Sequence, residues 1–115
     1  MLFENVIGQD FIKSHLTTSV DAGRIAHAQL FVGKTGSGTL PMAIAYAQYI
    51  LCNNAQGENT QGNASCNLKF EQLAHPDLHF AFPVATTSAI KSHPVSSNFA
   101  SEWRSFVKEN PYGDL

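Results

Sequence analysis

A short glycine-rich stretch, residues 31 to 41 with the sequence FVGKTGSGTLP, has the spacing of a phosphate-binding loop. Such a loop, G-x-x-x-x-G-K-[ST], encloses a phosphate with backbone N–H groups and the N-terminus of the following helix, while its lysine neutralises charge and its hydroxyl holds magnesium. Gly33, Gly36 and Gly38 keep this glycine frame. The stretch therefore predicts a place where a phosphate or another anion is held.

The two positions that carry the chemistry depart from the pattern. Thr39 stands where the lysine belongs, and Leu40 stands where the serine or threonine belongs. Lys34 is basic, but it lies in the middle of the loop and cannot project along the helix axis as the missing lysine would. We therefore expect the three glycines and Thr39 to form a degenerate loop, which predicts no ATP hydrolysis and leaves weak binding of an anion or a nucleotide open.

Acidic residues give a second test, because phosphoryl transfer in this class of protein needs an Asp at the end of an apolar strand to complete the magnesium site. Asp10, Asp21, Asp77 and Asp114 each lack a preceding apolar strand. We thus predict no catalytic residues. An active ATPase or small-molecule kinase with an atypical phosphate loop stays open as the alternative.

The cysteines and histidines could bind a metal. Cys52 and Cys66 are too few for a secreted disulfide scaffold, so they predict free thiols in a reducing compartment. His75 and His79 in HPDLH have a zinc-finger-like spacing, but the proline between them and the strand pattern turn them away from one helical face. We interpret them as a loop and an exposed strand histidine, and His27 as a packing or hydrogen-bonding residue.

Helical and strand patterns alternate around these residues. An apolar residue recurs every four positions at Ile12, Leu16 and Val20, which predicts a helix that Gly23 caps. Residues 26–33, AHAQLFVG, are typical of a short strand. Residues 39–52, TLPMAIAYAQYILC, predict a helix that is buried on most sides, with Pro41 in its first turn.

The second half repeats the alternation. Residues 53–65 are polar and rich in Asn and Gly, which predicts a solvated insertion loop. A short helical piece around residues 67–74 precedes a second predicted strand, residues 75–84, in which Leu78, Phe80 and Phe82 alternate. A last helix follows, with Asn98 as its candidate cap. Its apolar stripe consists of Phe99, Trp103 and either Phe106 or Val107.

This order of elements predicts an α/β fold, a parallel sheet flanked by helices, because a parallel return needs a crossover. Two strands are too few for such a sheet, so we expect residues 1–115 to be the N-terminal part of a larger domain. The apolar content of 43% and the net charge of −2 fit a compact unit that does not bind nucleic acid by itself. The N-terminus has no signal pattern and no apolar run reaches membrane length, which predicts a cytoplasmic protein without a membrane partner.

Several of these motifs together resemble a known family. The segments FENVIGQ, GRIAHAQLFVG and MAIAYAQYILC are similar to the N-terminal AAA+ domain of bacterial DNA polymerase III clamp-loader subunits, which is a P-loop fold. The later HPDLHFAFPV and EWRSFVKENPY resemble the delta prime group of these subunits rather than gamma/tau. Gamma/tau subunits keep the loop lysine and hydrolyse ATP, whereas delta prime subunits commonly have a degenerate loop, as Thr39 and Leu40 make it here.

The resemblance implies partners and a function. It implies a non-catalytic subunit that assembles with gamma/tau and delta subunits, and that helps to load the sliding clamp on primer-template DNA during replication, as part of the polymerase holoenzyme. It also implies an arginine offered to a neighbour's ATP, but Arg24 and Arg104 stand in no matching motif.

The family also carries a zinc module with four cysteines after the loop helix. Cys52 and Cys66 stand where its first and last cysteines belong, whereas Thr60 and Asn63 occupy the two middle positions. Neither replaces a thiolate, so we interpret Cys52 and Cys66 as a remnant of that module and expect no zinc.

Overall fold

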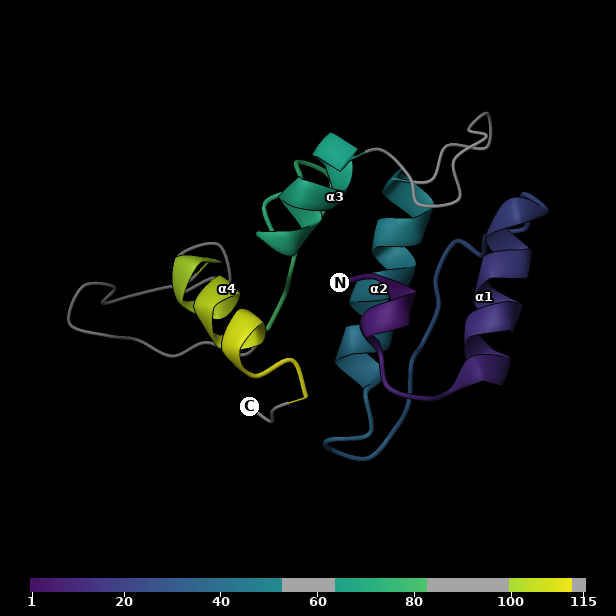
Figure 1. The fold of residues 1–115 in the computed structure, drawn as a ribbon, viewed down its shortest axis with the longest axis horizontal. Coiled ribbons are helices and arrows are strands. Elements are labelled where there is room, and N and C mark those ends of the chain that lie inside the picture. Colours follow the sequence, from purple (N-terminus) through teal and green to yellow (C-terminus); the bar gives the residue numbers. More distant parts are fainter. Residues whose placement is uncertain (53–63, 83–99, 113–115) are drawn as a thin grey trace.

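The computed structural model describes residues 1–52, 64–82 and 100–112 and arranges their helices around one central helix (Figure 1). The chain begins with a 3-10 turn, η1 (Phe3–Asn5), and continues through α1 (Asp10–Asp21), α2 (Thr39–Cys52), α3 (Ala64–Glu71) and α4 (Ala100–Glu109). Helix α2 contacts η1, α1 and α3. Figure 1 shows α1 on one side of α2, with α3 and α4 on the other.

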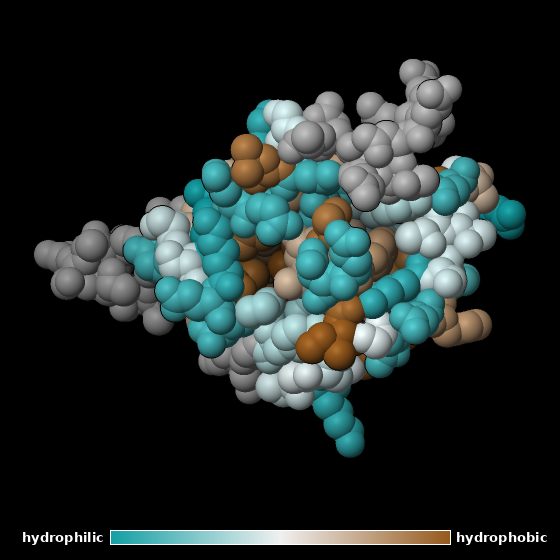
Figure 2. All heavy atoms as spheres, in the orientation of Figure 1, coloured by the Kyte–Doolittle hydropathy of each residue, from teal (hydrophilic) through white to brown (hydrophobic). Residues whose placement is uncertain are grey.

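Helix α2 is central because its sequence is apolar on all sides. Its buried residues are Pro41, Met42, Ile44, Ala45, Tyr46, Gln48 and Cys52. One side packs with Val6 and Leu16 of the N-terminal segment and α1, and the other side packs with Phe70, Leu73 and Val107 from the α3 and α4 regions. Figure 2 shows hydrophobic residues at the base of a hollow between α4 and α2. The prediction of a helix buried on most sides is confirmed.

Helix α1 also follows its sequence pattern. Leu16 is buried and Val20 packs against the same cluster, although Ile12 is 41% exposed. The helix ends where Gly23 adopts a φ of 70°. The Gly23 amide donates to the Val20 carbonyl at 3.0 Å and the Arg24 amide donates to the Ser19 carbonyl at 2.8 Å. This paired bonding at a left-handed residue is the Schellman arrangement, which favours glycine at that position and confirms the predicted cap.

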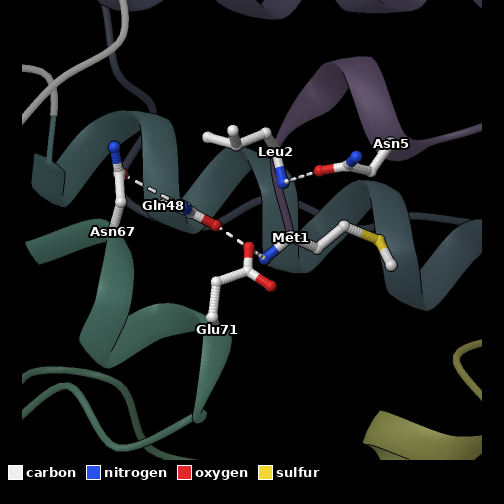
Figure 3. A network of polar contacts seen from close by, with 6 residues as sticks. All are labelled: Met1, Leu2, Asn5, Gln48, Asn67 and Glu71. Carbon is white, nitrogen blue, oxygen red and sulfur yellow. Dashed lines mark hydrogen bonds and ion pairs between the residues drawn. The ribbon is translucent and has the colours of Figure 1, made fainter. Parts of the chain in front are cut away.

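Gln48 is the buried polar residue of α2, with 1% of its surface exposed. Figure 3 shows that it lies between the N-terminus and α3. Its Oε1 accepts a hydrogen bond from the Met1 ammonium at 2.7 Å, and its Nε2 donates to Asn67 Oδ1 at 3.0 Å. The same ammonium lies 3.2 Å from Glu71 Oε1. A buried amide with both ends paired avoids the penalty of burial, so Gln48 joins three segments that are distant in sequence.

Neither predicted strand forms within the described residues. Residues 26–33 are not helical and include a bend at residues 27–28, and in the part of the chain that the structure describes their backbone makes no hydrogen bond to another backbone group. Leu30 and Val32 are 88% and 83% exposed. A strand exists only when neighbouring strands pair with it, and an apolar pattern cannot supply those neighbours. The predicted parallel sheet is therefore not observed in residues 1–52, 64–82 and 100–112.

The second predicted strand, residues 75–84, is described as far as residue 82. Leu78, Phe80 and Phe82 are half-buried there, whereas His79 and Ala81 between them are exposed. The predicted alternation is thus confirmed, although the segment pairs with no strand among the described residues. Its inward side chains pack beside α4, where Phe82 stacks on Trp103 with ring centroids 4.3 Å apart.

Other boundaries differ slightly from the predictions. Helix α3 begins at Ala64, so the last two residues of the predicted loop 53–65 are helical. Helix α4 begins at Ala100, and the predicted cap Asn98 and the core residue Phe99 lie outside the described residues. Among the helices of the described residues, none has the length and apolar character that crossing a bilayer requires.

Candidate phosphate-binding loop

The glycine loop joins the predicted strand segment, residues 26–33, to the first turn of α2. Gly36 and Gly38 have φ angles of 80° and 95°, which residues with a Cβ rarely adopt. Ser37 closes the loop, because its amide and its hydroxyl both donate to the Lys34 carbonyl, at 3.0 and 2.6 Å. The backbone conformation therefore explains why the predicted glycine frame has glycine at Gly36 and Gly38.

Gly33 is required by close packing instead. A Cβ at this position would lie 2.4 Å from Thr39 Oγ1 and 2.6 Å from Ser37 Oγ. These two hydroxyl oxygens are themselves 3.3 Å apart. The space inside the loop next to Gly33 is thus occupied by hydroxyl groups of the loop itself.

The two positions that depart from the phosphate-loop pattern lie at the start of α2. Thr39 is the first residue of the helix, and its hydroxyl faces Ser37. Leu40 packs against the cluster that contains Ile44, Phe70 and Val107. The position that would supply a metal-binding hydroxyl is therefore part of the apolar core, and Lys34 is exposed in the loop.

Tyr112, which follows α4, is a residue of this site that the sequence reasoning missed. The Ile7 amide donates to its hydroxyl at 2.9 Å. Its ring lies over the loop, because a Cβ at Gly38 would be 3.1 Å from Tyr112 Cε1. A cavity of about 150 Å³ is lined by the loop and by this segment, through Gly33, Lys34, Thr35, Gly36, Gly38, Thr39, Leu40, Pro41, Pro111 and Tyr112.

Among the described residues, no acidic side chain lines this cavity. Asp10 begins α1, and Asp21 accepts a hydrogen bond from the Tyr49 hydroxyl at 2.7 Å. Asp77 donates its amide to His75 Nδ1 at 3.0 Å in a turn, and Asp114 lies outside the described residues. None of the described aspartates lines the cavity at the loop.

The prediction of free thiols is wrong. Cys52 and Cys66 form a disulfide that joins the last residue of α2 to the first half of α3. Their Cα atoms are 5.5 Å apart, because the packing of α3 against the end of α2 brings the two residues together. Sulfur atoms bonded to each other are not available as thiolate ligands for a metal.

The described residues contain no group of three or more His, Cys, Asp or Glu that could hold a metal ion. His75 caps its own turn and packs near the ring of Phe70, while His79 and His27 are exposed. The interpretation of His75 as a loop residue and of His79 as an exposed residue is confirmed. His27 is no packing residue, since its side chain faces solvent.

Two side chains of α4, Trp103 and Arg104, hold this helix against its neighbours. Trp103 is half-buried among Phe80, Phe82 and Phe106, which confirms that it packs in the core. Arg104 donates from Nε to the Leu73 carbonyl at 3.0 Å and so holds α4 to the end of α3.

A glycine loop that leads into a buried helix is the framework of phosphate-loop proteins. Comparison with known proteins gives the family: a model described as DNA polymerase III, delta subunit, matches residues 8–112. The chain belongs to this family, which is a family of clamp-loader subunits of DNA polymerase III.

Individual relatives agree with the family. The delta' subunit of Bacillus subtilis is 35% identical over 68 residues, which are 59% of this chain and 20% of the relative. The gamma/tau subunit of Mycobacterium bovis is 38% identical over 64 residues, 56% of this chain and 11% of the relative. The gamma subunit of Buchnera aphidicola is 35% identical over 77 residues, 67% of this chain and 21% of the relative. The matches thus span about a fifth of these relatives or less, and no solved structure matches the chain.

Proposed function

We propose that this chain acts in a clamp loader of DNA polymerase III as a non-catalytic subunit of the delta prime kind. The observation that carries the proposal is the start of α2, where Thr39 replaces the phosphate-binding lysine and Leu40 packs in the core. A loop without these two groups lacks the charge and the metal ligand of ATP hydrolysis. ATP turnover then belongs to partner subunits.

The finer fold that we propose is an AAA+ domain. The predicted strand segments 26–33 and 75–84 are its strands, and they pair with further strands when the domain is complete. The exposed side chains of Leu30 and Val32 support this, because apolar residues on a strand are normally covered by a second layer.

The partners that we propose are gamma/tau and delta subunits and, through the complex, the sliding clamp and primer-template DNA. Two arguments support them: the family match, and the similarity to both delta' and gamma/tau relatives. The net charge of −2 supports contact with DNA through the complex rather than by this chain alone.

The deciding experiment is calorimetric titration of this chain with magnesium-ATP. Loss of one charge-assisted phosphate contact costs about 1.5–3 kcal/mol, which is roughly one to two decades of affinity. We expect no binding in the micromolar range. A micromolar dissociation constant, with ATP turnover that is lost in Lys34→Ala, would instead support the alternative of an active ATPase or kinase.

A second experiment tests assembly. The protein is mixed with gamma/tau and delta subunits and separated by size exclusion. We expect one complex whose DNA-stimulated ATPase depends on this subunit, and Thr39→Lys with Leu40→Thr should change that ATPase little, because the hydrolytic site lies in the neighbour. Separate elution of the subunits at micromolar concentration would refute the proposal.

A further inference from the structure

The segment after α4 lies across the glycine loop. Tyr112 is held at two points: its hydroxyl accepts the Ile7 amide at 2.9 Å, and its ring packs against the backbone at Gly38. The next two ring atoms toward Gly38, Cδ1 and Cζ, are 3.8 and 3.9 Å from where its Cβ would be. A side chain at position 38 would be strained at this positive φ, and its Cβ would push the ring back by a few tenths of an ångström.

The position of this ring matters for any anion. Gly38 directly precedes α2, and the first amides of a helix have no carbonyl partner within the helix. These amides, at Thr39 and Leu40, are the groups that an incoming phosphate would meet. Both residues line the same cavity as Pro111 and Tyr112. The aromatic ring and a phosphate would therefore compete for the same approach to the helix.

We propose that Tyr112 is an autoinhibitory latch that keeps phosphate groups out of the glycine loop. The hydrogen bond to Ile7 fixes the ring over Gly38, and displacement of residues 110–112 opens the loop. The proposal deepens the proposed function, on which it rests, since it adds a steric reason for a silent loop to the chemical reason at Thr39 and Leu40.

The test is a titration with inorganic phosphate, followed by the NMR shifts of the amides of Gly36 and Gly38. In Tyr112→Ala we expect phosphate affinity to rise roughly tenfold or more over the unaltered chain, which corresponds to 1.4 kcal/mol. Tyr112→Phe keeps the ring and should gain much less. The matched control is Tyr49→Ala, which removes a tyrosine whose hydroxyl bonds to Asp21 instead. Equal affinity in Tyr112→Ala and the unaltered chain, or an equal gain in Tyr49→Ala, overturns the proposal.

Hydrogen exchange at the Ile7 amide is the second readout and needs no ligand. Tyr112→Phe removes the acceptor, so exchange of this amide should accelerate about tenfold, while the Val6 amide, which donates to the Phe3 carbonyl, keeps its rate. An unchanged Ile7 rate overturns the latch even if Tyr112→Ala does not fold.

The outcomes also separate the latch from the proposed function. If neither the unaltered chain nor folded Tyr112→Ala binds phosphate, the latch is wrong and the non-catalytic assignment stands. If the unaltered chain binds magnesium-ATP at micromolar concentration, both are wrong.

Discussion

Reduction of the disulfide between Cys52 and Cys66 should destabilise the chain strongly. The bond links the end of α2 to α3 and closes a loop between two cysteines that are 14 residues apart in sequence. Closing a loop of about 15 residues restricts the unfolded chain enough to stabilise the folded state by about 3 kcal/mol. Because 1 kcal/mol shifts the melting temperature of a domain of this size by about 4 °C, reduction should lower it by roughly 12 °C.

The assay is thermal unfolding followed by circular dichroism, with and without a phosphine reductant. The matched control is the double variant Cys52→Ala with Cys66→Ala, which should melt near the reduced protein and be insensitive to the reductant. Two results would refute the reasoning: an unchanged melting temperature once thiol titration shows two free thiols per chain, or two free thiols in protein that was prepared under oxidising conditions.

The remaining predictions concern packing, the buried amide and metal. Phe70→Ala should lower the free energy of unfolding in urea by about 3–5 kcal/mol, because Phe70 is fully buried, whereas Leu68→Ala on the same helix should change it by less than about 0.5 kcal/mol. Gln48→Leu should cost about 1–3 kcal/mol in the same assay, since it leaves the Met1 ammonium without a buried partner, and an unaltered midpoint would argue against that contact. Elemental analysis should find well under one zinc per chain; one zinc per chain that is lost in Cys66→Ser would contradict us.

The helices could be predicted from the sequence because their signals are local. The four-residue apolar spacing of α1, the glycine after it and the continuous apolar run of α2 lie within each element. Strands cannot be predicted from local signals in the same way. Residues 26–33 have the side-chain pattern of a strand, but their pairing depends on backbone partners that the pattern does not contain.

The same distinction applies to the site. The glycine frame and its missing lysine are contiguous, so the loop geometry was predictable from residues 33 to 40. The position of Tyr112 at the loop was not predictable, because it depends on contacts between distant parts of the chain. Its hydrogen-bond partner Ile7 is 105 residues away in sequence. The number of cysteines does not predict the disulfide, because the bond depends on how α3 packs against the end of α2.

The position of Met1 has a practical consequence for recombinant work. Its ammonium lies between Gln48 Oε1 and Glu71 Oε1 (Figure 3). An affinity tag fused ahead of Met1 turns this ammonium into a neutral amide, which has a single hydrogen to donate and cannot form the ion pair with Glu71. Tagged and untagged preparations should therefore differ in how firmly the N-terminal segment is held to α2 and α3. Stability measurements on this protein are best made after the tag has been removed without leaving extra residues.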